Sequence, residues 1–503
     1  MKININKSTP GLAKKAAAAG LAVALMAPAA RSSDFGGEDF GTLIEQLLHS
    51  KSQQLFGIGQ PVGASAPATV GNYRTATQSA SAQVLVADGL KVEYLTRNAG
   101  NSTDMMAFYP AENPTHLITC VEGSRSNLGA GKYNPSVQRI NLATGVVETV
   151  LRGMDACDGI RTTPWGTVLA TEERKDGSAY EILNPLSTNT LDYEINITDR
   201  GACGNAATFD KSTSNVAKRT ALPCMAWEGL IILPSGVVIA GDELRPGTSV
   251  ADGSGGVDSD GGAIFKFIPA GAAPVNPITN LTASPFVAGT THAMQVSCNG
   301  DGQQYGQGCE VGNAAWVSVN AATARADART NGATGYYRPE DLEQDPTFAD
   351  GDAIRFCWTN TQEEDALSFG EVMCAIDEEP LTASATARTV VVYRFVEGDQ
   401  DFNSFDNLAF QPKTGILYVI EDHPNGDIFA CLPDGADRDI KSDGCVKILS
   451  VKDSSAEPTG FIFDSTGTTA YLSVQHSNDG NMPLFDGYRT DDVLKITGFQ
   501  LKK

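Results

Sequence analysis

The stretch that decides the fold is DACDGIRTTPWGTVLATEER, which runs from Asp155 to Arg174. A short apolar segment leads into a Pro-Trp-Gly turn, and a second strand-like segment returns from the turn to Glu172 and Glu173. Two short strands joined by a tight turn form a hairpin, whose first and last residues lie at the same edge of a sheet. The stretch therefore predicts a hairpin that brings Cys157 close to the two glutamates.

The same outline recurs further along the chain. It is found in EGLIILPSGVVIAGDE (Glu228–Glu243), DNLAFQPKTGILYVIED (Asp406–Asp422) and EPTGFIFDSTGTTAYLSVQH (Glu457–His476). Each segment begins with a carboxylate, passes a glycine turn and returns along a strand that ends in Asp, Glu or His. Repeated hairpins of this kind are typical of radial repetition around an axis. We therefore predict an all-β fold, a six-bladed β-propeller with loop insertions, and a pair of β-sandwich domains is the alternative.

The N-terminal part of the chain differs in character. Residues 1–29 combine lysines, an apolar run from Ala16 to Ala27 and an Ala-Pro-Ala cleavage site, which is the pattern of a secretory signal. A membrane anchor is disfavoured because a span requires about 20 apolar residues. Gly41–Phe56 has helical apolar spacing. We expect a Sec-like signal that directs the protein to the periplasm or the medium, a helical and loop extension over 30–88, and a propeller catalytic domain over 89–503.

The overall charge narrows the range of partners. The formal net charge is −23 at pH 7, which disfavours nucleic acid as a partner. An acidic surface keeps a secreted protein soluble through self-repulsion, and clustered carboxylates suit hard cations such as calcium. We expect a monomer without stable membrane association that acts on a small molecule.

The ten cysteines indicate an oxidising compartment. Eight of them are close in sequence and predict local disulfides: Cys203 with Cys224, Cys298 with Cys309, Cys357 with Cys374, and Cys431 with Cys445. Cys120 and Cys157 remain. They either pair with each other, or Cys157 is a free thiolate that is available to a metal ion.

In a propeller, the hairpin ends meet at the mouth of the central channel. So many acids would repel one another in a partly buried site, and metal cations would neutralise them. The alternative is that they are solvated strand ends that point apart. The carboxylates that would share the pocket are Asp158, Glu172, Glu173, Glu228, Glu243, Asp406, Glu421, Asp422 and Glu457.

The segment YYRPEDLE, from Tyr336 to Glu343, adds a cation to this acidic set. Arg338 and Glu340 are two residues apart, which in an extended segment places both side chains on one face. An arginine beside a carboxylate-held metal suits a phosphate ester, because the guanidinium binds two oxygens while the cation binds a third. A surface ion pair is the alternative. No G-x-S-x-G or H-E-x-x-H motif is present, so serine hydrolases of the α/β type and zincins are not supported.

Taken together, Cys157 with TPWGT and EE, then RPED, DNLAF and EPTG with QH downstream resemble the PhoX-type alkaline phosphatases, a family of secreted bacterial phosphomonoesterases. The resemblance extends from about Gly89 to the C-terminus. It implies a six-bladed propeller that holds Fe(III) and Ca²⁺ in its channel. It also implies a metal-dependent enzyme that hydrolyses phosphate monoesters and releases inorganic phosphate.

The resemblance implies a role for each matching residue. Arg338 would bind the phosphate, and the Cys157 thiolate would bridge the irons and act in catalysis. The remaining implied metal ligands are Glu173, Glu228, Glu340, Asp406, Glu122 and Glu457, with His476 at a further motif position.

One departure from the family pattern bears on the metals. The first-blade motif is TCVE (Thr119–Glu122), which places Cys120 near the channel. A Cys120–Cys157 disulfide would remove the implied iron ligand. The alternative function is therefore a calcium-stabilised secreted propeller with a binding or adhesion role and no iron-dependent catalysis. A calcium-dependent lactonase is disfavoured, because a neutral lactone has no use for Arg338.

Overall fold

The structure is a computed structural model that describes residues 40–187, 195–250, 257–258, 260–297, 310–361, 369–433, 444–475 and 481–501. Strands make up most of the regular structure within these ranges, so the prediction of a mostly β protein is confirmed. The predicted secretory signal lies outside the described residues, as do Cys298, Cys309 and His476. Within the described ranges, no helix is both long enough and apolar enough to span a membrane.

The strands form mainly antiparallel sheets. The first sheet holds β3 (Thr103–Tyr109), β4 (His116–Val121), β7 (Pro135–Asn141), β8 (Val147–Arg152), β12 (Ile195–Asp199) and β13 (Thr208–Phe209). The second holds β9 (Cys157–Thr162), β10 (Thr167–Glu172), β11 (Ala179–Leu183) and β14 (Val216–Lys218).

A longer sheet follows along the chain. It runs through β15 (Trp227–Ile232), β16 (Val238–Asp242), β19 (Ile264–Pro269), β20 (Gly289–Ser297) and β21 (Gly312–Val319), and continues through β25 (Val390–Glu397), β24 (Glu371–Asp377), β23 (Ile354–Asn360) and β22 (Pro339–Gln344). Two short hairpins are formed by β5 (Asn127–Gly129) with β6 (Lys132–Tyr133), and by β17 (Ser249–Val250) with β18 (Val257–Asp258).

The last two sheets each take a strand from the N-terminal part of the chain. One holds β26 (Phe405–Phe410), β27 (Leu417–Glu421), β28 (Asp427–Cys431), β29 (Cys445–Val451) and β1 (Val84–Val86). The other holds β30 (Glu457–Phe463), β31 (Thr469–Gln475), β32 (Thr490–Thr497) and β2 (Lys91–Gly100). The N-terminal segment before Gly89 therefore contributes an edge strand to a sheet of the main fold.

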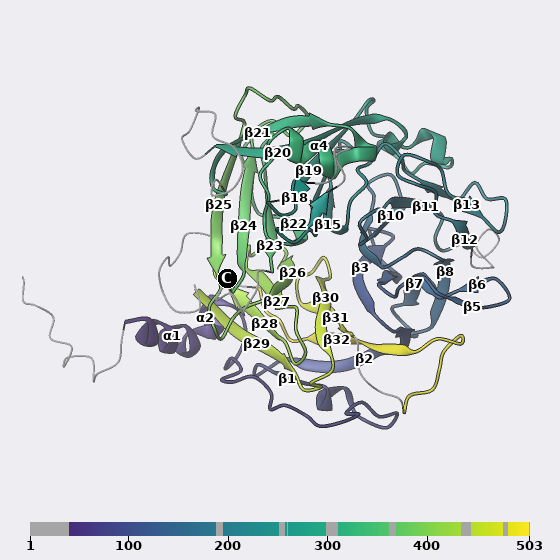
Figure 1. Cartoon of the computed structure of the whole chain (residues 1–503). Coiled ribbons are helices and arrows are strands. Elements are labelled where there is room, and N and C mark those ends of the chain that lie inside the picture. The colour runs from purple at the N-terminus through teal and green to yellow at the C-terminus, as the bar shows by residue number, and fades with distance from the viewer. Residues whose placement is uncertain are drawn as a thin grey trace, which may run out of the picture.

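Helices are short and peripheral in the described part of the chain. α1 (Phe40–Ser50) and α2 (Ser52–Leu55) confirm the helical segment predicted over Gly41–Phe56, and α4 (Ala324–Thr330) follows β21. Single 3₁₀ turns occur at Ala80–Ala82, Leu281–Ala283, Pro285–Val287 and Ala321–Thr323. None of these elements interrupts the sheets, which are arranged around a common centre (Figure 1).

The strands nearest this centre contact one another in a closed series. β3 lies beside β9, β9 beside β15, β15 beside β22, β22 beside β26, β26 beside β30, and β30 beside β3. Each of these inner strands begins a hairpin with the next strand of its sheet, and four of the six hairpins, those that begin with β9, β15, β26 and β30, are the ones that the repeated sequence outline predicts. The starts of hairpins that are far apart in sequence therefore lie near one another.

Glycines allow neighbouring inner strands to approach closely. Gly159 follows Asp158 in β9, and a β-carbon at Gly159 would lie 2.0 Å from the carbonyl oxygen of Glu228 in β15. Gly229 follows Glu228, and a β-carbon there would lie 2.0 Å from the backbone nitrogen of Leu342 in β22. Any larger residue would push these strands apart. The close approach holds the acids that precede each glycine within reach of one another.

The hydrophobic core is divided into layers between adjacent sheets. Trp165 packs edge-on against Phe286 with ring centroids 4.9 Å apart, in a cluster that joins the second sheet to the first half of the long sheet. Tyr418 and Phe463 are also 4.9 Å apart and join the last two sheets. Burial of these large rings stabilises the contacts between sheets. The apolar core therefore lies between the sheets, and the centre of the fold is left to polar side chains.

Candidate metal and anion site

A cavity of about 150 Å³ lies where the inner strands begin. Every inner strand of the closed series contributes one carboxylate to it. These are Asp104 of β3, Asp158 of β9, Glu228 of β15, Glu340 of β22, Asp406 of β26 and Glu457 of β30. The other lining residues are Glu122, Glu173, Asp422, Gln475 and Arg338.

The second strand of several hairpins also ends at this cavity. Glu122 directly follows β4, Glu173 follows β10, Asp422 follows β27, and Gln475 is the last residue of β31. The hairpin rule inferred from the sequence therefore accounts for both sets of acids. All the acidic residues that the PhoX resemblance assigned to metal binding line this one cavity.

Two groups of three carboxylates are close enough to hold metal ions. The first is Asp158, Glu173 and Glu228, and the second is Glu228, Glu340 and Asp406. Within each group, one oxygen from each residue lies within 4.8 Å of the other two. Glu228 belongs to both groups, so it could bridge two cations. Only oxygen ligands are offered, and these are the ligands that hard cations such as Ca²⁺ prefer.

The electrostatics of the cavity favour the binding of a positive charge. Burial raises the pKa of Asp158, Glu228, Glu340 and Asp406 well above the usual range for carboxylic acids. Neighbouring acids raise the pKa of Asp158 and Asp406 further, with Asp104 as the largest charged contributor to each. The buried Oδ1 atom of Asp158 also has no hydrogen-bond partner. A cation would reverse this destabilisation, because it favours the ionised form of each acid.

Arg338 is the one basic residue among those that line the described cavity. Its Nε atom donates a hydrogen bond to Glu243 Oε1 at 2.6 Å, and its Nη2 atom lies 2.9 Å from Glu340 Oε1. Asp422 Oδ2 is 3.4 Å from the guanidinium. Burial alone would lower the pKa of Arg338, but these three carboxylates raise it instead. The guanidinium is therefore permanently charged and available to an anion.

Arg338 and Glu340 form the predicted pair, but not because both lie in an extended segment. Arg338 has a φ of 49° and directly precedes β22, whereas Glu340 lies within the strand. Positive φ is unusual for a residue with a branched or long side chain. This backbone turn, and not strand alternation, directs the guanidinium toward Glu243 and Glu340.

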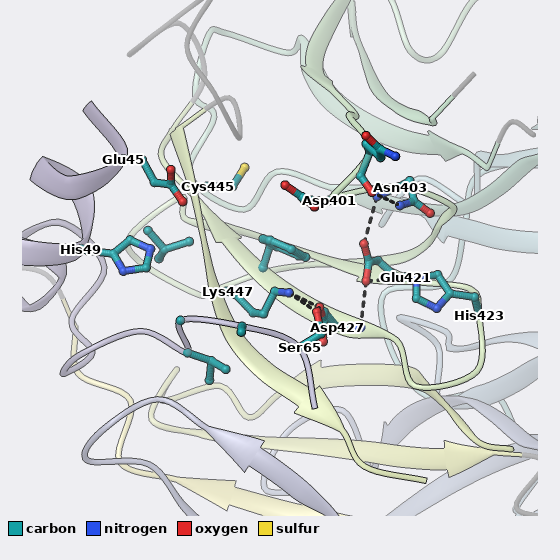
Figure 2. A pocket seen from close by; sticks show the side chains of 16 residues that line it. Glu45, His49, Ser65, Asp401, Asn403, Glu421, His423, Asp427, Cys445 and Lys447 are labelled. Carbon is teal, nitrogen blue, oxygen red and sulfur yellow. Dashed lines mark hydrogen bonds and ion pairs between the residues drawn. The ribbon is translucent and has the colours of Figure 1, made fainter. Parts of the chain in front are cut away.

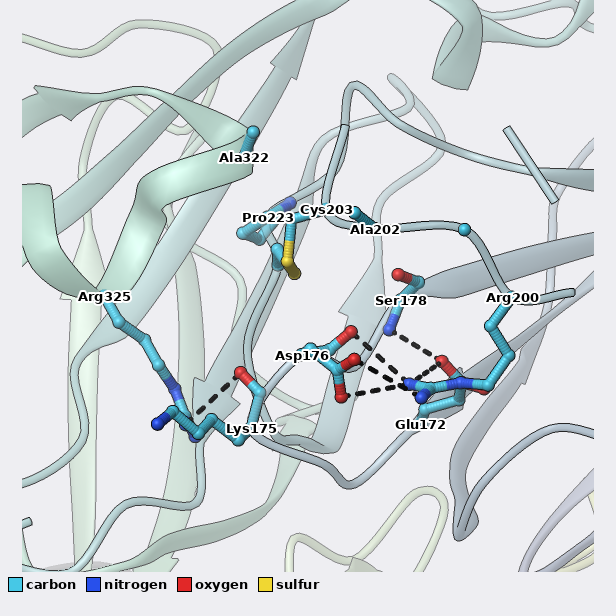
Figure 3. Close-up of a disulfide and its surroundings, with 12 residues drawn as sticks. Glu172, Lys175, Asp176, Ser178, Arg200, Ala202, Cys203, Pro223, Ala322 and Arg325 are labelled. Carbon is cyan, nitrogen blue, oxygen red and sulfur yellow. Dashed lines mark hydrogen bonds and ion pairs between the residues drawn. A yellow bond between two sulfur atoms is a disulfide. The ribbon is translucent and has the colours of Figure 1, made fainter. Parts of the chain in front are cut away.

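Three acids that were expected in the shared pocket do not line the cavity. Glu243 lies beside the cavity and binds Arg338, whereas Glu172 and Glu421 lie elsewhere. Glu172 accepts hydrogen bonds from Arg200, with 2.7 Å between Nε and Oε1, in the neighbourhood of the Cys203–Cys224 disulfide (Figure 3). Glu421 accepts from the backbone nitrogens of Asn403 and Asp427, each at 2.9 Å. The expectations for Glu172 and Glu421 were wrong because consecutive side chains at a strand end point to opposite sides.

Of the two alternatives for Cys157, a free thiolate or a disulfide with Cys120, the structure has the disulfide. Cys157 and Cys120 form a disulfide, and both side chains are fully buried. Their Cα atoms are 5.0 Å apart, because β4 and β9 lie side by side near the inner ends of their sheets. A sulfur in a disulfide cannot act as a thiolate ligand. The implied iron-bridging and catalytic roles of Cys157 are therefore not available in this structure.

The remaining disulfide predictions fare better. Cys203–Cys224, Cys357–Cys374 and Cys431–Cys445 are all formed. The predicted Cys298–Cys309 pair lies outside the described residues. No cysteine in the described part of the chain is free.

Two residues of the cavity, Gln475 and Asp104, were not predicted from the sequence. Gln475 Nε2 donates to Asp104 Oδ2 at 2.9 Å and to Glu122 Oε2 at 3.0 Å, which ties the first and last sheets together. Asp104 begins the apolar run MMAFY, which is the pattern that identifies the other inner strands. This signal was present in the sequence and could have revealed Asp104.

A second and larger cavity, of about 520 Å³, lies between α1, the segment near Ser65 and the sheet of β26–β29 (Figure 2). Its buried acids already have basic partners. Lys447 pairs with Asp427, and His423 Nε2 lies 3.3 Å from Glu421 Oε2. Because these charges are compensated within the protein, the smaller cavity is the better candidate for a metal and anion site.

The fold and the site together define a class of protein. Inner strands of a mostly β fold converge on a cluster of carboxylates beside one charged guanidinium, which suits a metal-assisted enzyme for anionic substrates. Residues 246–478 match the family described as alkaline phosphatase PhoX, so this part of the chain is similar to that family. The matched region includes Arg338, Glu340, Asp406 and Glu457. No curated protein sequence matches the chain.

The comparison with solved structures agrees with this family match at the level of the fold. The chain is similar to the Pseudomonas fluorescens PhoX in complex with vanadate, a transition-state analogue, with a TM-score of 0.56 and 15% identity over 85% of this chain and 97% of that one. A gluconolactonase from Xanthomonas campestris also matches, with a TM-score of 0.39 and 11% identity over 87% of this chain and 98% of that one. The gluconolactonase match is too weak to support an inference about this protein.

Proposed function

We propose that this protein is a secreted, metal-dependent alkaline phosphatase that hydrolyses phosphate monoesters and releases inorganic phosphate. The observation that carries the proposal is the position of Arg338, whose guanidinium faces a cavity otherwise lined by acids and one amide. A phosphate group needs both a bidentate donor and cations that neutralise its remaining oxygens. The family match supports the same activity.

The residues fit calcium better than thiolate-bound iron. The two carboxylate groups that share Glu228 supply oxygen ligands, which suit Ca²⁺, and we propose Ca²⁺ as the principal cofactor. Fe(III), the other ion implied by the resemblance, retains only carboxylate ligands here, because Cys157 is bonded to Cys120. When bound, cations at these groups would neutralise the acids and polarise the phosphoryl group. We propose Asp158, Glu173, Glu228, Glu340 and Asp406 as their principal ligands, with Glu122 and Glu457 at the edge of the site.

The protein itself would supply orientation and charge. The Nη atoms of Arg338 can donate to two phosphoryl oxygens and offset the negative charge that these oxygens carry in the transition state. Glu243 holds the Nε side of the same guanidinium, and a bound phosphate would replace Glu340 and Asp422 as the partner of the Nη atoms. Asp422 and Glu340 keep the arginine charged. No side chain of the described cavity is needed as a nucleophile.

We also propose how the chain is organised around this activity. The closed series of inner strands supports a β-propeller of six blades over residues 89–503, in which β1 adds an edge strand from the preceding extension, 30–88. Residues 1–29 are proposed as a secretory signal that directs the protein to the periplasm or the medium. A monomer without nucleic-acid or membrane partners is the simplest form consistent with a substrate cavity supplied by one chain.

The test is hydrolysis of p-nitrophenyl phosphate at alkaline pH by calcium-loaded protein. Turnover should fall by at least about 100-fold in Arg338→Ala, since one donor to a transition-state charge is worth that much. Arg329→Ala is the matched control, because Arg329 lies on α4 and pairs with Asp260 away from the cavity. Equal turnover in wild type and Arg338→Ala would refute the proposal. Calcium binding with no turnover in wild type would favour the alternative, a calcium-stabilised binding protein, which the loss of the Cys157 thiolate also favours.

A further inference from the structure

The Cys120–Cys157 disulfide differs in position from Cys357–Cys374 and Cys431–Cys445. Cys357–Cys374 joins paired strands of one sheet, and Cys431–Cys445 does the same in another. Cys120 lies in β4 of the first sheet, whereas Cys157 lies in β9 of the second. This disulfide therefore links two neighbouring sheets, and it does so near the centre around which all the sheets are arranged.

The link is adjacent to two acids of the cavity. Cys157 directly precedes Asp158, which belongs to the first group of three carboxylates. Cys120 lies two residues before Glu122, which lines the same cavity. Both sulfurs are buried, so they cannot exchange freely with solvent thiols. Asp158 is therefore one residue, and Glu122 two residues, away from a cysteine of the same disulfide.

We propose that the Cys120–Cys157 disulfide is a positioning element that presets an all-oxygen cation site. It fixes the separation of Asp158 and Glu122 before a cation binds. Preorganised ligands bind more tightly because less ordering is required on binding. Hard cations such as Ca²⁺ accept a site with oxygen ligands alone. This inference rests on the metal site of the proposed function.

The first test measures cation binding and not catalysis. Cys120→Ala/Cys157→Ala and the control Cys357→Ala/Cys374→Ala are compared with wild type, after chelation, by calorimetric titration with Ca²⁺. The first pair should lose at least about 10-fold in calcium affinity, which corresponds to about 1.4 kcal/mol. The control should lose stability, since its disulfide is also removed, but should bind Ca²⁺ as wild type does. Equal calcium affinity in all three proteins would overturn the proposal.

A second test keeps the proposal open to refutation if the double variant does not fold. A peptide map of folded, calcium-binding wild type made without reductant should contain the cross-linked Cys120–Cys157 fragment. Free Cys120 and Cys157 in that map would overturn the proposal, because the site would then form without the bridge. Phosphatase turnover enters neither test, so a failure of the proposed activity is distinguishable from a failure of the inference.

Discussion

Arg338 and Glu243 are joined by a hydrogen bond of 2.6 Å from Nε to Oε1, and both residues stand just outside regular strands, before β22 and after β16. The bond occupies the side of the guanidinium that a phosphate does not need. Glu243 is therefore a positioning residue for the arginine. The two residues come from neighbouring inner hairpins, so the orientation of Arg338 depends on the packing between them.

Replacement of Glu243 should weaken substrate binding more than turnover. A hydrogen bond to a charged group contributes roughly 1.5–3 kcal/mol, so Glu243→Ala should raise the KM for p-nitrophenyl phosphate by about 10-fold or more. Glu243→Gln should recover part of the loss, since its amide oxygen can still accept from Nε. Steady-state kinetics provide the measurement. Glu148→Gln is the control, because Glu148 is exposed and pairs with Arg139 far from the cavity. An unchanged KM in Glu243→Ala would show that the arginine holds its orientation without this partner.

Removal of calcium should destabilise the protein. A ligand present at 100 times its Kd stabilises the folded state by about 2.7 kcal/mol, and each occupied site adds its own contribution. Chelation should therefore lower the Tm in differential scanning fluorimetry, and added Ca²⁺ should restore it. Glu228→Gln should abolish most of this response, because Glu228 belongs to both carboxylate groups. A Tm that is indifferent to chelation would exclude the groups as occupied cation sites.

Lys266 and Asp377 form an ion pair of 2.7 Å in which both side chains are fully buried. Trp316 supports the pair, since its Nε1 atom donates to Asp377 Oδ2 at 3.2 Å. Lys266→Met leaves the carboxylate buried without its charge partner, which should cost about 3–5 kcal/mol in the free energy of unfolding by urea. Lys132→Met breaks the exposed pair with Asp486 and should cost no more than about 1 kcal/mol. Similar losses in the two variants would contradict this ranking.

The interaction of His423 with Glu421 should make the stability of the folded protein depend on pH in the alkaline range. Burial alone would lower the pKa of His423, but the Glu421 carboxylate raises it to about 9. Because the folded value exceeds the unfolded value of about 6.5, the stabilisation is complete below pH 6.5 and is lost as the pH rises through 9. The Tm difference between wild type and His423→Gln should therefore shrink between pH 6.5 and about 10.

Burial also raises the pKa of Glu421, so the same difference should decline again in acid, where Glu421 takes up a proton. Glu421→Gln is the control, because it removes the carboxylate that raises the pKa of His423, and in that background His423→Gln should produce no such alkaline change. A Tm difference that stays constant across the alkaline range would mean that His423 is neutral in the folded protein.

Much of the fold and of the site was predictable from the sequence, because hairpins with acidic ends repeat at recognisable turns. The rule located Asp158, Glu228, Asp406 and Glu457, and the structure gathers all four in one cavity. Adjacent acids were harder to assign, since sequence alone does not give the side to which Glu172 points.

Other features depend on contacts that leave no local pattern. Cys120 and Cys157 are 37 residues apart, and only the packing of β4 against β9 brings them together. The positive φ of Arg338 occurs at a residue type that rarely adopts it, so no turn signal announces it. Asp104 differs from these cases, because the sequence around it has the same acid-then-apolar pattern as the other inner strands and could have been recognised from that pattern.

β32 (Thr490–Thr497) lies between β31 and β2, and β2 comes from the first strands of the chain. A ribosome therefore makes Lys91–Gly100 long before it makes the partner of that segment. Gln475, close to β32 in sequence, also joins Asp104 to the last sheet. The last sheet can pair with β2 only after Thr490–Thr497 has been synthesised. Until then, Asp104 and Glu457 have no fixed spacing, so a nascent chain has no complete binding centre and acquires one only in the last step of its folding.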